Sequence, residues 1–298
     1  MTQPRVLLVC DRYGWANEQA CRALARFLLD DFETRVVSNA EVNAESMAWA
    51  DLLYSSIYYG RGAGHPRSVT QISSPSYFIR RRKRLDGFPE RLREWSHVVA
   101  KNREIAGMLT DEDHPSIRLL YHHLDPWTFT PADDRHYRLD GPLRVGFTGH
   151  DKPFKGTRKI REAVGTDPRF ELRTLTFGGD TIAVDQMPAW YNGLDVYVCA
   201  SRPGKDAGPR PPMEAGLCGC AVVTTEVGQI GEMVLDRRDG LVVDWTSDSI
   251  REALLTLHAD RRLLVQLGEA ASRSFRQRWA LDVGRSWRNY FLEILRCR

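Results

Sequence analysis

Long hydrophobic runs are absent from this chain of 298 residues. No apolar stretch approaches the roughly 20 residues that a membrane-spanning helix requires. The amino terminus has only a short apolar run before Asp11, which does not suit a secretory signal peptide. We also find no internal repeat and no low-complexity segment. The sequence therefore predicts a cytoplasmic protein, or one held peripherally at a membrane face.

Paired metal-ligand spacings are also missing. The six cysteines include no Cys-x-x-Cys pair, and most lie in apolar contexts, so we expect reduced thiols. A metal or redox pair at Cys218 and Cys220, and a metal site at His122 and His123, stay open as alternatives. We find no acidic pair of the Asp-x-Asp kind that marks a catalytic metal. The expectation is a metal-independent protein.

Composition is ordinary, with 42% hydrophobic and 27% charged residues, but the charge is unevenly distributed. The net charge is only +3, yet residues 61–103 contain eleven Lys or Arg against three acidic residues, a local charge of +8. Such a block is either a solvated face or a surface that recruits a polyanion, meaning nucleic acid or an anionic membrane. Its densest part is the run Arg80, Arg81, Arg82, Lys83 and Arg84.

Length and pattern together predict two α/β domains. A chain of this length can bury two modest cores. Residues 5–10 form a buried strand, followed by a glycine-containing loop and a helix over 16–29, as at the start of a doubly wound sheet. A second sheet is expected to begin at 143–148, after a polar linker over 131–142. We therefore place the first domain at 1–138.

The most informative segment is 187–244, which predicts a strand, a loop rich in glycine and proline, a helix, a buried strand and a second loop and helix. Pro211 and Pro212 suit the first turn of that helix. In a parallel sheet, the loop between a strand's carboxyl end and a helix binds anions, because free N–H groups and the helix dipole face them. Asp206 and Glu214 form a carboxylate pair there, suited to the hydroxyls of a sugar and a ribose.

An ordered pattern runs through this segment: Trp190-Tyr191, Asp195, Ser201, Asp206, Glu214-Ala215, Cys218-Gly219-Cys220, Val222-Val223, Gly228, Gly231-Glu232 and Asp239-Gly240-Leu241-Val242-Val243. It resembles the nucleotide-binding core of retaining glycosyltransferases of the GT-B fold, family four. The resemblance implies two Rossmann-like doubly wound domains facing across a cleft, with the helix over about 282–298 crossing back to the first domain. The second domain is then 139–281. A plain amphipathic helix on the second domain is the alternative.

The resemblance also implies a nucleotide-sugar substrate, UDP- or GDP-linked, with no cofactor. Lys155 would carry the charge of the donor diphosphate, Asp206 would hold the sugar and Glu214 the ribose, and these three are the candidate catalytic residues. The implied donor site comprises Gly149, His150, Lys155, Gly204, Lys205, Asp206, Ala207, Gly208, Glu214 and Glu232. No protein nucleophile is required, because the leaving diphosphate helps to deprotonate the acceptor.

Three positions depart from the family pattern. The family's diphosphate-binding Arg falls on Gly149 or His150, so half of a cationic clamp is missing, or Lys152 or Arg158 replaces it. Its histidine after a first-domain strand falls on Ser73, while His65 lies in the preceding loop. Asp206 stands where the family has Glu. A non-catalytic relative that binds sugar nucleotides or nucleic acid is therefore the alternative function.

The expected acceptor is polyanionic or surface-bound. The candidate acceptor-binding residues are Tyr13, Gly14, Trp15, Ser73, Arg80, Arg81, Arg82, Lys83 and Arg84. The turn around Gly14 either forms part of an acceptor site or is a tight turn with Trp15 packed on the sheet. The acceptor would be a hydroxylated DNA base, flipped out of its stack, or a lipid or polysaccharide intermediate at a membrane. No obligate protein partner is evident.

Overall fold

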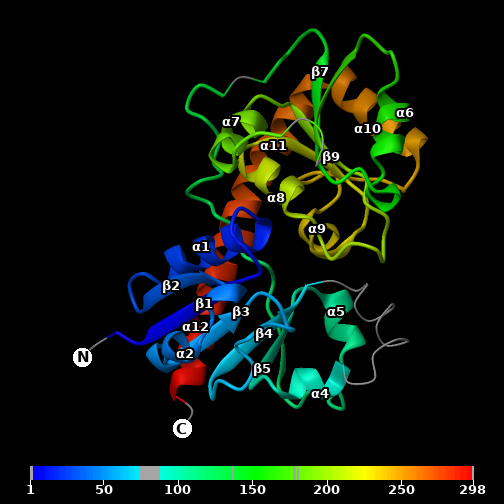
Figure 1. Cartoon of the computed structure of the whole chain (residues 1–298). Coiled ribbons are helices and arrows are strands. Elements are labelled where there is room, and N and C mark those ends of the chain that lie inside the picture. Colours follow the sequence, from blue (N-terminus) through cyan, green and yellow to red (C-terminus); the bar gives the residue numbers. More distant parts are fainter. Residues whose placement is uncertain (1–2, 74–87, 136, 177–178, 180, 297–298) are drawn as a thin grey trace. The chain divides into compact units, whose positions relative to one another are not determined.

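The computed structural model describes residues 3–73, 88–135, 137–176, 179 and 181–296. The chain divides into two compact units, Met1–Asp125 with Ala280–Arg298, and Pro126–Trp279. Each unit is a parallel sheet with helices around it, which confirms the predicted doubly wound α/β class (Figure 1). The contacts thus assign 126–138 to the second unit, whereas the sequence analysis placed these residues in the first.

The first unit has a sheet of order β2-β1-β3-β4-β5-β6, in which all strand pairs are parallel. Its strands are β1 (Arg5–Cys10), β2 (Glu33–Ser38), β3 (Leu52–Ser55), β4 (Ser68–Ile72), β5 (His97–Ala100) and β6 (Ile117–Leu119). Its helices are α1 (Ala16–Leu28), η1 (Asn39–Glu41), α2 (Ala44–Trp49), α4 (Phe88–Arg93), α5 (Arg103–Met108) and α12 (Asp282–Arg296). The strand order reverses between β1 and β3, so ligands are expected beside the loops that follow these two strands.

Strand β3 has only four residues, Leu52–Ser55. It ends at Ser55 because the Ser55 hydroxyl donates to the carbonyl of Ile57 at 2.8 Å, which turns the chain. The indole N–H of the buried Trp95 then donates to the carbonyl of Tyr58 at 2.7 Å. These two bonds set the loop after β3 against the sheet.

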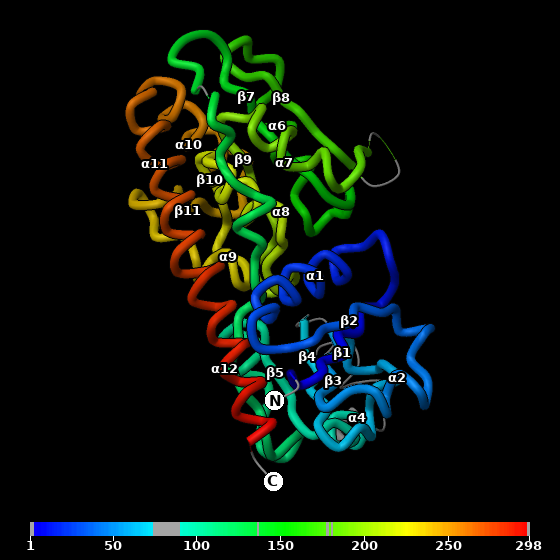
Figure 2. Tube along the Cα trace, turned by 90° about the vertical axis from the view of Figure 1, so that its left-hand side faces the viewer, coloured from blue at the N-terminus to red at the C-terminus, as the bar shows by residue number. Residues whose placement is uncertain are grey.

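Helix α12 packs on the first unit. Trp287 and Phe291 are fully buried, and the ring centroid of Trp287 lies 5.1 Å from that of Tyr54 on β3. The indole N–H of Trp287 donates to the carbonyl of Tyr121 at 2.9 Å. Figure 2 shows this helix, in red, beside the first unit, and its contacts with α1 place it there. The final helix therefore returns to the first unit, as the resemblance implies.

The second unit has a parallel sheet of order β11-β10-β9-β7-β8. Its strands are β7 (Leu143–Gly149), β8 (Phe170–Thr176), β9 (Val196–Cys199), β10 (Ala221–Thr224) and β11 (Leu241–Val242). Its helical segments are η2 (Pro153–Lys155), α6 (Thr157–Val164), η3 (Val184–Gln186), α7 (Met187–Asn192), α8 (Arg210–Leu217), α9 (Gly228–Met233), α10 (Ser247–Ala259) and α11 (Arg261–Ser274), and the π-helical η4 (Phe275–Leu281) leads from α11 to α12. The order reverses between β7 and β9, which places the expected ligand edge at the loops that follow these strands.

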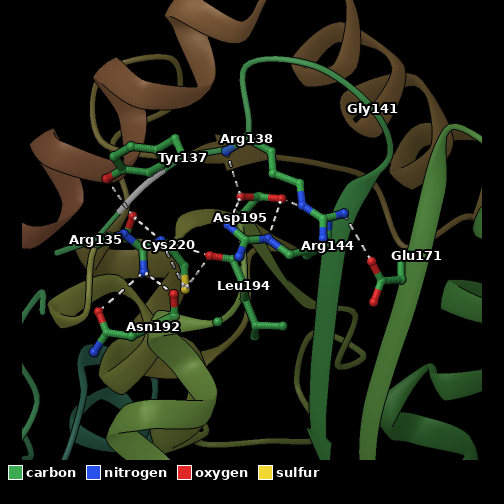
Figure 3. A network of polar contacts seen from close by, with 12 residues as sticks. Arg135, Tyr137, Arg138, Gly141, Arg144, Glu171, Asn192, Leu194, Asp195 and Cys220 are labelled. Atoms are coloured by element: carbon green, nitrogen blue, oxygen red, sulfur yellow. Dashed lines mark hydrogen bonds and ion pairs between the residues drawn. The ribbon is translucent and has the colours of Figure 1, made fainter.

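The amino-terminal edge of this sheet is held by a polar network (Figure 3). Asp195 is fully buried just before β9 and accepts from the guanidinium of Arg144 at 2.5 Å and from its backbone N–H at 2.8 Å. Arg135 donates to the carbonyl oxygens of Asn192 at 3.1 Å and Leu194 at 2.8 Å. These bonds attach the segment after Pro126 to the second sheet, which explains where the two units divide.

Candidate functional site

The loops that follow β7 and β9 touch each other at the switch point of the second sheet. Gly156 closes the first loop with a left-handed backbone, φ +71°. A Cβ atom at this position would lie 2.1 Å from the carbonyl oxygen of Ala200, at the start of the second loop. Only glycine combines this backbone with this close approach. The loop that carries Lys155 is therefore tied to the loop that carries Asp206.

Lys155 and Asp206 meet at this edge. The Lys155 ammonium donates to Asp206 Oδ2 at 2.5 Å, and the Ser201 hydroxyl donates to the same oxygen at 3.1 Å. Their side chains are only 18% and 15% exposed, so water and salt screen this charge pair incompletely. At this place Lys155 could bind an anion, and Asp206, directly beside it, could accept hydrogen bonds from hydroxyl groups.

Glu214 lies on α8 and is held by two neighbours. Its Oε2 accepts from the hydroxyl of Tyr191 at 3.0 Å, and its Oε1 accepts from Nε of Arg210 at 3.1 Å. Burial raises the pKa of Tyr191 well above its usual value, which keeps this hydroxyl protonated as a donor. The sequence analysis identified neither Arg210 nor Tyr191 as a hydrogen-bond partner of Glu214. The spacing of four residues between Arg210 and Glu214 on one helix face was the available signal.

The start of α8 is a weaker anion site than the sequence analysis expects. The helix begins at Arg210, so Pro211 and Pro212 occupy its next two positions. Proline has no backbone N–H group, and two of the donors that a helix start normally offers are therefore absent. The partly buried Lys155 and the buried Arg210 contribute positive side-chain charge at this edge.

Other predicted donor residues lie in or beside the loop after β9, whereas Gly149 ends β7 and His150 follows it. Gly208 has φ +106°, and a Cβ there would lie 2.5 Å from the backbone nitrogen of Gln229 on α9. The carbonyl of Ala207 accepts from the same backbone N–H at 3.0 Å. Lys205 is exposed in this loop, which also contains Gly204, and Glu232 lies on α9. The loop is thus packed against the start of α9.

Besides Lys155, the loop after β7 carries His150 and Lys152, and Arg158 lies just beyond it on α6. Burial, and then the nearby charges of Lys152 and Lys155, hold the pKa of His150 below its usual 6.5. Near neutral pH His150 is therefore uncharged and can donate or accept a hydrogen bond. Arg158 is 84% exposed and pairs with Glu162 at 3.0 Å, and Lys152 is also exposed. Lys155 is the partly buried cation of this loop.

Residues 145–260 match the family model described as Glycosyl transferases group 1. The matched segment runs from β7 to α10 and contains Lys155, Asp206 and Glu214. The match covers most of the second unit, which is similar to this family. The family suspected from the ordered pattern is thereby confirmed.

Solved structures with the GT-B fold are similar to the whole chain. Sucrose-phosphate synthase from Thermosynechococcus elongatus has 11% identity and a TM-score of 0.76, covering 99% of this chain and 100% of that chain. HepE from Anabaena in complex with UDP and glucose has 15% identity and a TM-score of 0.73, covering 97% and 99%. A glycosyltransferase from Rickettsia africae has 12% identity and a TM-score of 0.69, covering 100% of both. A comparison with curated protein sequences finds no significant match.

These likenesses show the GT-B fold, and together with the family model they indicate a glycosyltransferase. In the first unit of this glycosyltransferase, Tyr13, Gly14 and Trp15 lie in the loop after β1, at the switch point of that sheet. The hydroxyl of Tyr13 donates to Glu41 at 2.5 Å, while 44% of Tyr13 stays exposed. The guanidinium of Arg12 stacks 3.3 Å from the ring centroid of Trp15. This loop is a polar and aromatic surface.

Ser73 follows β4 at the same carboxyl edge. His65 does not replace the histidine that the family has near Ser73. It is buried before β4, where one ring nitrogen lies 3.1 Å from the carbonyl of Ala50 and the other accepts from the backbone N–H of Arg67 at 3.1 Å. His65 thus serves the structure at the opposite edge. The cationic run of five residues, Arg80, Arg81, Arg82, Lys83 and Arg84, lies outside the described residues.

The alternative metal sites receive no support. Among the described residues, no group of three or more His, Cys, Asp or Glu is placed to hold a metal ion. Cys220 donates to the carbonyl of Tyr191 at 3.1 Å, and burial raises the pKa values of both Cys218 and Cys220. The chain does contain one Asp-x-Asp sequence, but its Asp113 is buried and accepts from the backbone N–H of Thr110 at 3.0 Å. No helix in the described ranges has the length and apolar character needed to span a bilayer.

Proposed function

We propose that this protein is a retaining, metal-independent glycosyltransferase that moves a sugar from UDP or GDP to an acceptor hydroxyl. Lys155 bears the charge of the donor diphosphate, Asp206 holds sugar hydroxyls and Glu214 holds the ribose. HepE, which shares the fold, has been solved with UDP and glucose and with UDP-glucose, which supports a uridine diphosphate donor. The observation that carries the proposal is the contact between Lys155 and Asp206 at the switch point.

In the proposed transfer each bond that forms is matched by one that breaks, and the protein has to position the reactants without bonding to them. The acceptor oxygen forms a bond to the anomeric carbon while the bond from that carbon to the diphosphate oxygen breaks. The proton of the acceptor hydroxyl passes to the departing diphosphate. Lys155 stabilises the negative charge that grows on the leaving group, in a partly buried setting where that interaction is strengthened. Asp206 and Ser201 orient the sugar without taking part in a covalent step.

A thermal-shift screen with UDP, GDP, ADP, CMP and their sugars tests the donor. A nucleotide at 100 times its dissociation constant should stabilise the protein by about 2.7 kcal/mol. For a domain of this size that corresponds to a rise in melting temperature of roughly 5–10 °C. We expect UDP or GDP to give this rise and CMP none. A screen in which no nucleoside diphosphate raises the melting temperature would contradict the proposed function.

Hydrolysis of the nucleotide sugar distinguishes a transferase from the alternative, a relative that binds without catalysis. A transferase should slowly release the nucleoside diphosphate from its donor with water as acceptor. The matched control is the Glu214→Ala variant, which lacks the proposed ribose contact and should release far less. Donor binding with no release at any enzyme concentration would favour the non-catalytic relative.

The acceptor is proposed to be polyanionic or surface-bound. In the described part of the basic stretch, four cations are exposed on the first unit: Arg61, Arg91, Arg93 and Arg103. Lys101 is buried and does not add to that surface. A mobility shift of duplex DNA that weakens as salt is added would favour a hydroxylated base as acceptor. Flotation with anionic liposomes would favour a lipid or polysaccharide intermediate at a membrane. Flotation with the liposomes would also support a location at a membrane face.

A further inference from the structure

The carbonyl oxygen of Ala200 is the point at which the two donor loops meet. Gly156 packs directly on this carbonyl, as described above, and Lys155 immediately precedes Gly156. A second link lies beside the first, because the backbone N–H of Arg202 donates to the carbonyl of Phe154 at 2.7 Å. The position of the Lys155 ammonium relative to Asp206 therefore depends on how firmly Ala200 is held.

Trp245 holds that carbonyl from a third direction. It lies three residues after β11, and its indole N–H donates to the carbonyl oxygen of Ala200 at 2.8 Å. Strand β11 stands at the sheet edge, two strands away from β9, so the half-buried indole reaches across the end of β10 to make this bond. An aliphatic side chain at position 245 could not supply the donor.

The ring of the same indole lies near two cations, one on α6 and one on the loop after β9. Nζ of Lys159, on α6 just after Gly156, lies 4.5 Å from the Trp245 ring centroid. The guanidinium carbon of Arg202, on the loop after β9, lies 5.1 Å from it. Both distances fall within the range of cation–π attraction. The Trp245 ring therefore contacts α6, which directly follows the first loop, and the loop after β9, while its N–H binds the carbonyl at which the two loops meet.

We propose that Trp245 is a positioning residue for the donor, acting through Ala200 on the geometry of Lys155 and Asp206. This inference rests on the proposed function, because it assigns Trp245 a part in nucleotide-sugar binding. Without the indole N–H, the Ala200 carbonyl loses a partner and the two loops lose a shared anchor. The Lys155–Asp206 pair then samples more positions, and binding the diphosphate must order it.

Trp245→Phe is the informative variant, because it keeps an aromatic ring for Lys159 and Arg202 but removes the N–H. Trp49→Phe is the matched control. Trp49 is also half-buried beneath two cations, with the guanidinium carbons of Arg5 and Arg35 at 5.7 and 4.0 Å from its ring, but it belongs to the first unit. We expect Trp245→Phe to raise the dissociation constant for UDP and the KM for UDP-glucose about tenfold. The value of kcat should change much less, and the control should match the wild type.

Hydrogen exchange without nucleotide gives a readout that does not depend on activity. In Trp245→Phe, amides in 149–156 and 200–209 should exchange at least about tenfold faster, while β7 and β9 keep their protection. Unchanged exchange in both loops, or a fall in kcat with KM unaltered, would overturn the role of Trp245. A wild-type protein that binds neither UDP nor GDP would instead overturn the proposed function, and the exchange result would still decide whether Trp245 holds the loops.

Discussion

Replacing Lys155 with Ala should lower kcat for sugar transfer by roughly 100- to 1000-fold, the loss seen when one preorganised donor to a developing anion is removed. The ammonium is 18% exposed and stands at the switch point, so solvent cannot substitute for it well. The loss should fall mainly on kcat, because charge on the leaving diphosphate is greatest in the transition state. The loss of kcat is measured from the rate at which the nucleoside diphosphate is released at saturating UDP-glucose or GDP-sugar.

Arg158→Ala is the matched control for Lys155→Ala. It removes one positive charge from the next turn of chain, but this side chain is 84% exposed and already paired with Glu162. We expect its kcat to stay within about twofold of the wild type, because exposed charges are screened by salt. Equal losses in the two variants would show that only the general charge of the loop matters. A fully active Lys155→Ala variant would remove Lys155 from the proposed site.

Asp195→Ala should destabilise the second unit by about 3–5 kcal/mol, which is the loss expected when a buried ion pair is left with one partner. Asp195 has no exposed side-chain surface, and Arg144 has only 14% of its own. Figure 3 shows the contacts that join them. Removing the carboxylate takes away the acceptor that Asp195 gives to the guanidinium and to the backbone N–H of Arg144. Urea unfolding of the variant, followed by tryptophan fluorescence, measures the free energy of unfolding.

Asp151→Ala serves as the control for this stability effect. Asp151 also pairs with an arginine, Arg161, at 3.3 Å, but both side chains are about half exposed. Exposed pairs of this kind contribute only about 0–1 kcal/mol. A similar small effect in Asp195→Ala would mean that the network at the amino edge does not stabilise the sheet as inferred.

Local pattern was sufficient for several elements and for the edge of the sheet at which we propose that the donor binds. The apolar run predicted over 5–10 is β1, and the strand predicted over 143–148 is β7, because short runs of buried β-branched residues have few alternatives. Parallel strands also place the loops after β7 and β9 at one edge. The pairing of Lys155 with Asp206 follows from that topology once the strand order is known.

Contacts between elements distant in sequence were not predictable in the same way. Trp245 and Tyr191 carry no periodic signal that points to Ala200 or Glu214, and their partners lie 45 and 23 positions away. The boundary near 138 was misplaced for the same reason, since Arg135 is anchored by carbonyl groups of the second sheet. Proline at the start of α8 suggested a favourable helix terminus, although it removes the donors that such a terminus needs.

The central claim is that the loops after β7 and β9 hold the diphosphate of a nucleotide sugar. Hydrogen exchange of the wild-type protein with and without saturating UDP, or GDP if the screen selects it, tests this claim most directly. The account predicts that added nucleotide slows exchange most strongly in residues 149–156 and 200–209. Binding that is measurable by calorimetry but slows exchange only in other segments would contradict it.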